Sequence, residues 1–291
     1  MTESPLSKII QAMAHDGVPP SDPGQIRPNG ALCRFHVQGD KSGTRNGWAV
    51  VYTDGIPAAA YGSWKHGVSA TWRARQPTKP AERERNRQRM EQARQQRERE
   101  RVQAHTEAAR RAKWLWRNAR RPDPGHGYLT AKGIGPHWAR QRGQSLLLPV
   151  FGFDRRLWSV QFIDPHGGKL LLAGGKKRGC CIPVQTPPEA ERVLICEGWA
   201  TGCTLADLEP ASLVLAAIDA GNLESVARQA RERWPDADMV VCADADDTGR
   251  AQARAAAIAA GALVAVPRFP TGATGSDFND LATLPRTEGG A

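Results

Sequence analysis

The chain has 291 residues, 40% of them hydrophobic, which suits a soluble globular protein with one or two cores. Its formal net charge of +10 favours a polyanionic partner, either nucleic acid or an anionic membrane surface. Because no run of 18 apolar residues occurs and the first residues lack the segments of a secretory signal, we expect neither a transmembrane helix nor secretion.

Residues 1–78 contain short alternating segments, such as ALCRFHVQ and GWAVVYTDG, separated by glycine turns. This alternation predicts a small, β-rich module with an antiparallel sheet. Its residues Trp48, Trp64 and Trp72 are either the core of that sheet or platforms on which bases stack. The six cysteines include no C-x-x-C pair, so we expect no zinc ribbon, and reduced thiols in a cytoplasmic protein.

Residues 79–121 contain no glycine and are rich in Arg, Glu and Gln, which are good helix formers. Opposite charges spaced for i,i+4 pairing support the same prediction. Few apolar residues occur before Trp114, so we expect a solvated helical linker. The alternative is an arm that binds nucleic acid, because Arg outnumbers Glu.

The remainder of the chain changes its pattern near residue 189. Residues 122–188 contain the segments SLLLPVFG and LWSVQFIDPHGGKLLLAGGKKRG, which indicate strands joined by turns. In residues 189–291, strands such as RVLIC and DMVVC alternate strictly with helical segments. Repeated strand–helix units predict an α/β fold with a parallel sheet covered on both faces. In such sheets the working groups gather at the carboxyl ends of the strands.

Carboxylates follow two of these strands directly. Glu197 comes after VLIC, and Asp244 and Asp246 come after MVVCA, with Asp247 as the expected N-cap of the next helix. Neighbouring carboxylates repel one another unless a cation lies between them, and oxygen clusters of this kind suit hard divalent ions such as Mg²⁺. A metal pair there would clamp the attacking and leaving oxygens of a phosphoryl or nucleotidyl transfer.

Other interpretations of the acidic cluster have less support. A single acid after a strand is usually a helix cap or a loop residue, and this alternative stays open for Glu197. An EF-hand loop starting at Asp244 would need a Glu at its twelfth position, where the chain has Ala255. The sequence also lacks G-x-x-x-x-G-K-[ST], so no P-loop ATPase is expected.

The segments LICEGWATG and CADADDTG resemble the Toprim domain, which bacterial primases, topoisomerases and certain nucleases share. With GYLTAKGI, AAIDAGNL and SDFNDLA, the stretch from about 122 to 283 is similar to the Toprim primases of phages, plasmids and integrative elements, such as the phage P4 alpha and conjugative-plasmid enzymes. The resemblance implies a Toprim-type parallel sheet flanked by helices in residues 189–291, and a primase-like α+β subdomain in residues 122–188.

The same resemblance implies roles for particular residues. Glu197 would be the acid–base residue of nucleotidyl transfer, and Asp244 and Asp246 would bind Mg²⁺ or Mn²⁺. Either Asp277 or Asp280 would complete the acidic site. The residues implied to contact nucleotide or template are Lys132, Lys169, Lys176, Lys177, Arg178 and Asn222. A charged surface loop is the alternative for the basic group, and a helix cap is the alternative for Asn222.

The function implied is that of a DNA primase, which synthesises short RNA primers on single-stranded DNA during replication of a mobile element. Its partners would be the single-stranded template, ribonucleoside triphosphates and a separate helicase or replication protein, with no membrane partner. A Toprim nuclease and a non-catalytic protein that binds single-stranded DNA remain the alternatives. A topoisomerase is not favoured, because no separate domain with a catalytic tyrosine is evident.

Overall fold

The computed structural model describes residues 3–77 and 80–284, and the chain divides into two compact units, Met1–Glu98 and Arg99–Ala291. None of the described helices has both the length and the apolar character needed to cross a bilayer.

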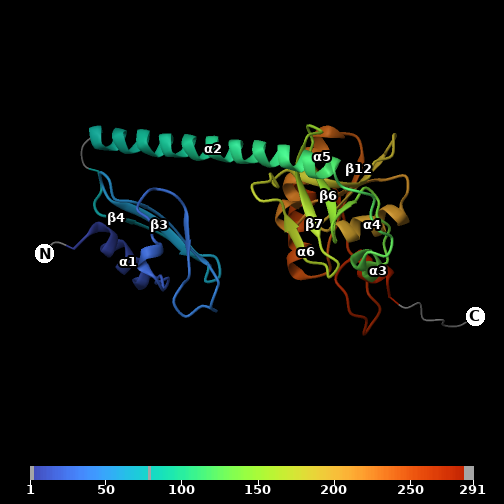
Figure 1. Ribbon diagram of the computed structural model, residues 1–291, viewed down its shortest axis with the longest axis horizontal. Helices are drawn as coiled ribbons and strands as arrows, with labels where there is room; N and C mark the ends of the chain where they lie inside the picture. Colours follow the sequence, from blue (N-terminus) through green and yellow to red (C-terminus); the bar gives the residue numbers. More distant parts are fainter. Residues whose placement is uncertain (1–2, 78–79, 285–291) are drawn as a thin grey trace, which may run out of the picture. The chain divides into compact units, whose positions relative to one another are not determined.

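The N-terminal unit is a four-stranded antiparallel sheet with one helix packed on it (Figure 1). Its elements are α1 (Pro5–His15), a 3-10 turn (Pro23–Gln25), β1 (Cys33–Phe35), β2 (Gly47–Tyr52), β3 (Ala58–Ser63) and β4 (Val68–Arg73). Buried and half-buried residues alternate along β2, as period-2 patterning requires. Ile9 and Met13 of α1 belong to the same core as Val51 and Tyr61, so the helix covers one face of the sheet.

The tryptophans of this unit divide between the two faces of the sheet. Trp72 packs against the apolar core. Trp48 points to the other face, where its ring centroid lies 6.1 Å from that of Trp64. The guanidinium of Arg34 lies 4.7 Å from the Trp64 ring, and Trp64 is 54% exposed. The interpretation of these residues as sheet core therefore holds for Trp72 and is wrong for Trp64.

Helix α2 (Pro80–Arg117) begins and ends close to the bounds expected of the linker, but it is not solvated throughout. Ala108, Ala109 and Ala112 are buried, which small side chains permit where a helix packs closely on its neighbours. Arg111 Nη2 donates to the carbonyl oxygen of Ala173 in the same C-terminal unit. The last turns of α2 are thus packed on this unit, contrary to the expectation of a solvated linker.

A nine-stranded sheet forms the centre of the C-terminal unit, in the order β13-β12-β10-β11-β9-β6-β7-β8, with β5 paired to β6. The strands are β5 (Arg140–Arg142), β6 (Ser145–Gly152), β7 (Leu157–Ile163), β8 (Lys169–Leu171), β9 (Cys180–Gln185), β10 (Arg192–Cys196), β11 (Leu213–Ala216), β12 (Asp238–Cys242) and β13 (Leu263–Ala265). The last four are parallel to one another, as strand–helix alternation predicts. Ile182 of β9 pairs with Ala216 of β11, so one sheet continues across residues 188 and 189.

Helices cover both faces of this sheet (Figure 1). They are α3 (Gly127–Lys132), α4 (Trp199–Leu208), a 3-10 turn (Ala220–Asn222), α5 (Leu223–Arg233), α6 (Asp247–Ala260) and α7 (Phe278–Ala282). Tyr128 of α3 and Trp199 of α4 lie in the apolar core of one face, with their ring centroids 6.3 Å apart. Val226 of α5 and Ala253 of α6 lie in the core of the other face. The predicted α/β architecture is confirmed.

Candidate active site

The carboxyl ends of the parallel strands lie level with one another. Cys196, the last residue of β10, pairs with Cys242 on one side and with Ala216 on the other. The residues that follow these three strands therefore meet at one edge of the sheet. Glu197 and Asp244 stand there, as the sequence predicts.

Asp244 is the most perturbed acid at this edge. Its Oδ1 is buried and accepts no hydrogen bond from any residue that the structure describes. Burial, followed by the charges of Glu197, Asp277, Asp246 and Asp280, raises the pKa of Asp244 to about 7. An ionised Asp244 is thus incompletely compensated by the protein, which is the condition in which a carboxylate binds a cation well.

Glu197 is half-buried in the turn between β10 and α4. Burial is the largest cause that raises its pKa, and the charges of Asp219 and Asp246 act in the same direction. The amide of Ala220 and the ammonium of Lys169 oppose this shift without cancelling it. A carboxyl group with a raised pKa exchanges protons more readily near neutral pH, which suits an acid–base residue.

Asp246, rather than Asp247, is the N-cap of α6. The backbone of Asp246 is extended, and its Oδ1 accepts from the amide of Gly249 at 2.7 Å. The prediction that Asp247 caps this helix is wrong, because Asp247 already belongs to the first turn. A Cβ on Gly249 would lie 2.8 Å from the Cβ of Asp244, so only glycine allows this turn to approach the buried acid so closely.

Asp277 and Asp280 both lie near Asp244, but they are bound differently. Oδ1 of Asp277 caps α7 by accepting from the amide of Asp280 at 2.8 Å, and its Oδ2 accepts from Thr201 Oγ1 at 3.1 Å. Asp280 Oδ1 lies 3.1 Å from Lys132 Nζ, and its Oδ2 accepts from the amide of Ser276. Although burial alone would raise the pKa of Asp280, these contacts outweigh it and lower the pKa.

These contacts bear on the choice of the additional acid and on the role expected of Lys132. The charge of Asp277 raises the pKa of Asp244 more than the charge of Asp280 does. Lys132, expected to contact phosphate, instead pairs with Asp280, and its carbonyl oxygen accepts from Asn279. Lys132 thus joins α3 to α7, and Asp277 is the better candidate for the additional acid.

Two lysines of the basic segment lie close to the acidic edge. The ammonium of Lys169 in β8 lies 4.0 Å from the position of a Cβ on Gly198, the residue after Glu197. Its charge lowers the pKa of Glu197. Lys177 Nζ lies 2.5 Å from Asp219 Oδ2. Strand β8 and the loop after it therefore bring cations to the acids.

The other two basic residues of this segment are Lys176 and Arg178. Lys176 Nζ lies 4.7 Å from the centroid of the Trp158 ring, which is the geometry of a cation–π contact. Arg178 is exposed in the same loop. The structure thus associates Lys176 with an aromatic side chain and leaves the guanidinium of Arg178 accessible to solvent.

Asn222 does not have either of the roles considered for it. It is 1% exposed and makes no side-chain cap of α5. Its Nδ2 donates to the carbonyl oxygens of Lys177, Cys180 and Ala217, and its Oδ1 accepts from the amide of Gly179. The side chain is thus occupied by backbone groups and joins the basic loop to the end of β11, instead of facing a metal or nucleotide.

Asp219 is a member of the site that the sequence analysis overlooked. It stands three residues after the end of β11, pairs with Lys177 and raises the pKa of Glu197. The signal was present, because Asp219 belongs to AAIDAGNL and follows a strand like the other acids. Ile218 before it has a φ of 80°, which is rare for a β-branched residue and persists only where the surroundings impose it.

The acids of the edge fit a divalent cation, although they do not form a closed cage. Within residues 3–77 and 80–284, no three His, Cys, Asp or Glu side chains stand close enough to hold one ion together. Mg²⁺ is often bound by one or two carboxylates, with waters and substrate phosphates completing its shell. The buried Oδ1 of Asp244, which accepts no hydrogen bond from a described residue, is suited to be one of these carboxylate ligands.

Comparison with known families agrees with this geometry. Residues 192–287 match the family model described as the Toprim domain. The matched residues include Glu197, Asp244 and Asp246 at the strand ends where the sequence placed them.

Curated relatives extend the likeness toward the N-terminus. Over 274 residues the chain is 30% identical to a DNA primase TraC of Escherichia coli, in a match that covers 86% of this chain and 25% of that protein. A second DNA primase TraC of Escherichia coli is 30% identical over 260 residues, which are 83% of this chain and 18% of that protein. The expected resemblance to Toprim primases is confirmed, and the chain spans a quarter or less of these relatives.

Solved structures include two distant likenesses. The primase fragment of the bacteriophage T7 primase-helicase protein superposes with a TM-score of 0.44 and 16% identity, over 53% of this chain and 68% of that one. The DnaG primase catalytic domain bound to single-stranded DNA gives a TM-score of 0.44 and 15% identity, over 65% of this chain and 77% of that one.

Proposed function

We propose that this chain acts as a DNA primase of a plasmid or other mobile element, making short RNA primers on single-stranded DNA. The observation that carries the proposal is the half-buried carboxyl group of Asp244, whose buried Oδ1 has no hydrogen-bond partner among the described residues, beside Glu197 at the edge of a sheet that matches the Toprim model. The similarity to two proteins named DNA primase supports it.

Each residue of the edge has a task in this reaction. Asp244 and Asp246 would hold Mg²⁺ or Mn²⁺, which when bound would supply positive charge to the triphosphate oxygens and to the leaving pyrophosphate, and the charge of Asp277 would act on Asp244. Glu197 accepts the proton of the primer 3′-hydroxyl. At the same time the hydroxyl oxygen bonds to the α-phosphorus of the incoming triphosphate, and the bond from that phosphorus to the leaving pyrophosphate breaks. Lys169 and Lys177, beside the acids, neutralise phosphate charge.

The proposed partners follow from this chemistry. The substrates are ribonucleoside triphosphates and a single-stranded DNA template, on which the incoming base pairs. A helicase or replication protein that unwinds duplex DNA is a further proposed partner.

Primer synthesis on single-stranded DNA with ribonucleotides and Mg²⁺ tests the proposal. The variant Asp244→Asn with Asp246→Asn removes two charges, and asparagine still caps α6. The matched control, Asp236→Asn with Asp238→Asn, removes the same charge from the opposite end of β12. We expect product from wild type and control but not from the first variant. Undiminished synthesis by that variant would exclude the assigned site.

The same reaction without ribonucleotides distinguishes a primase from a nuclease, the other activity considered for these acids. A nuclease would cut the DNA when metal alone is present, with water in place of the 3′-hydroxyl. Such cleavage, lost in the Asp244→Asn, Asp246→Asn variant, would replace the primase assignment with a hydrolytic one.

A further inference from the structure

A cationic cavity that the proposed chemistry does not use lies along the last turns of α2. Its volume is about 490 Å³, and α2, the end of β6 and the turn between β6 and β7 line it. The charged residues of the lining are Arg110, Lys113, Arg117, Arg155 and Arg156. No carboxylate is among the described residues that line it. Five cations around one hollow repel one another, so this cavity favours an anionic ligand.

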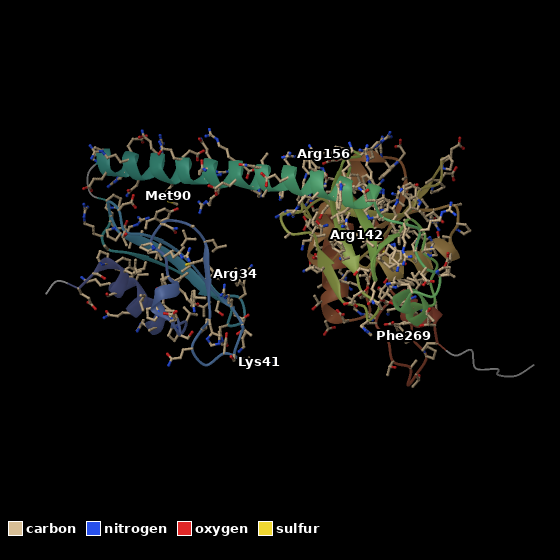
Figure 2. All side chains as sticks on the ribbon, in the orientation of Figure 1. Arg34, Lys41, Met90, Arg142, Arg156 and Phe269 are labelled. Atoms are coloured by element: carbon tan, nitrogen blue, oxygen red, sulfur yellow. The ribbon has the colours of Figure 1, made fainter. Side chains whose placement is uncertain are left out.

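Aromatic rings accompany the cations of this surface. The guanidinium of Arg156, labelled in Figure 2, lies 4.1 Å from the centroid of the Trp158 ring. Arg140 stacks in the same way on Trp116, which itself lines the cavity. The acid in the turn, Asp154, accepts hydrogen bonds from Trp158 Nε1 and from the amide of Arg156. It therefore organises the turn instead of pairing with the guanidinium groups around the cavity.

A second cavity, of about 630 Å³, adjoins the first on the face that α5 covers. Its walls are mainly apolar, with Trp138, Phe153 and Trp234 as large aromatic residues. The rings of Phe153 and Trp234 meet edge to face, with centroids 6.1 Å apart, and Trp138 is 50% exposed. Phe151 and Arg155 line both cavities, so a cationic surface and an aromatic pocket share one boundary.

Arg155, which lines both cavities, has a strained backbone conformation. Its φ is 59°, in the left-handed region where glycine or asparagine is the favoured turn residue. Its amide donates to the carbonyl oxygen of Gly152, a bond that any residue could make. The turn itself does not need an arginine, and the side chain of Arg155 lines both cavities.

We propose that this surface binds single-stranded nucleic acid, with phosphates along the cationic cavity and an unstacked base in the aromatic one. Cationic grooves flanked by aromatic rings are the usual means by which proteins hold single strands. A duplex keeps its bases stacked and does not fill the aromatic pocket. An acidic peptide would satisfy the cations but would leave the aromatic walls without a planar ligand.

This site is separate from the acids of the Toprim edge. Asp277 and Asp280 lie with α4 and α7 on one face of the sheet. Trp234 belongs to the core of the other face, together with α5. The proposed surface would hold a strand whether or not primer synthesis takes place, so its binding is measurable without catalysis.

The test is fluorescence anisotropy of a labelled single-stranded oligodeoxynucleotide with the whole chain, in EDTA and without nucleotides. The first variant carries Arg110→Ala, Lys113→Ala and Arg117→Ala. The matched control carries Arg85→Ala, Arg94→Ala and Arg97→Ala on the exposed part of the same helix. We expect the first to bind at least about tenfold more weakly, with a salt slope lower by about two, since each phosphate contact contributes about 0.7. The control should change less than about threefold.

Two single variants separate binding from folding. Arg155→Gly suits the turn, so we expect an unchanged or higher melting temperature together with weaker binding. Trp138→Ala should weaken binding of the oligonucleotide about fivefold or more, the effect of losing one stacked base, but not binding of an abasic strand of equal length.

Three results would overturn the proposal. One is equal binding by the Arg110, Lys113, Arg117 variant and its control. A second is unchanged binding by Arg155→Gly. The third is displacement of the strand by polyglutamate of equal charge as effectively as by unlabelled oligonucleotide, which would assign the surface to an acidic protein. The Asp244→Asn, Asp246→Asn variant should bind the oligonucleotide like wild type. The binding test therefore gives a clear result even if the primase proposal fails.

Discussion

Lys177 Nζ lies 2.5 Å from Asp219 Oδ2, and this ion pair joins the loop after β8 to the loop after β11. Asn222 holds the same two loops together, because its Nδ2 donates to the carbonyl oxygens of both Lys177 and Ala217. A cation from the antiparallel part of the sheet is thereby fixed beside Asp219, whose charge raises the pKa of Glu197.

Removal of the charge of Asp219 should alter the pH dependence of primer synthesis. In Asp219→Asn the pKa of Glu197 falls, because one of the charges that raise it is gone. The acid limb of the pH–rate profile should therefore move to lower pH, and KM for ribonucleotides should rise because Lys177 loses its anchor. The control, Asp238→Asn, breaks an ion pair with Arg192 at the far end of β12 and should leave the profile unchanged. Identical profiles for the two variants would contradict the assignment.

The half-buried acid Asp244 should make the protein less stable as the pH rises. Because its folded pKa is about 7 and its ordinary value is 3.8, the folded state binds more protons than the unfolded state between these limits. The free energy of unfolding therefore decreases as the pH rises through this window. Asp244→Asn should reduce this dependence and leave the part that Glu197, whose pKa is also raised, contributes.

At pH 8 we expect Asp244→Asn to melt about 2–4 °C higher than wild type, which corresponds to about 1 kcal/mol in a unit of this size. The effect is modest because water partly screens the side chain. Mg²⁺ should raise the melting temperature of wild type but not of the variant, as thermal denaturation with and without EDTA will show. A lower melting temperature for the variant at pH 8 would contradict the argument.

Asp277 and Asp280 should differ in their effect on activity. Asp277→Asn keeps a helix cap but removes the charge that acts more strongly on Asp244, so primer synthesis should fall roughly tenfold or more. Asp280→Asn loses its ion pair with Lys132 and should reduce synthesis only about two- to threefold. Rates at saturating ribonucleotide check this order, and the reverse order would make Asp280 the additional acid.

Asn222→Ala should destabilise the C-terminal unit by about 2–4 kcal/mol, because it leaves the amide of Gly179 and buried carbonyl oxygens without partners. Asn118→Ala removes one exposed hydrogen bond to Trp114 and should change stability by less than about 0.5 kcal/mol. Urea unfolding measures both. Unchanged stability with a higher KM for nucleotides would instead restore Asn222 as a direct nucleotide contact.

Much of the fold of the C-terminal unit could be predicted from the sequence because its signals are local. The strand that ends at Cys196 and the strand that ends at Cys242 are short apolar runs followed by polar residues. Their alternation with helical segments leaves a parallel sheet as the compact solution. Parallel strands of equal register then place Glu197 and Asp244 at one edge, which follows from chain direction alone.

The partners of individual side chains had no such local signal. Lys132 and Asp280 are 148 residues apart, and nothing in either neighbourhood indicates their ion pair. The N-cap of α6 fell on Asp246, one residue before the predicted position, because the choice between adjacent acids depends on the backbone angles where the loop meets the helix.

The sequence by itself determined the kind of sheet, the strand ends and the identity of the acids at them, since each depends on residues close together in the chain. Only the tertiary structure decided that Asn222 binds backbone, that Lys177 pairs with Asp219, and that the last turns of α2 pack on the C-terminal unit. The reason is that hydrogen bonds, ion pairs and helix packing join groups distant in sequence, and their partners are fixed only when the sheet has brought its strands together.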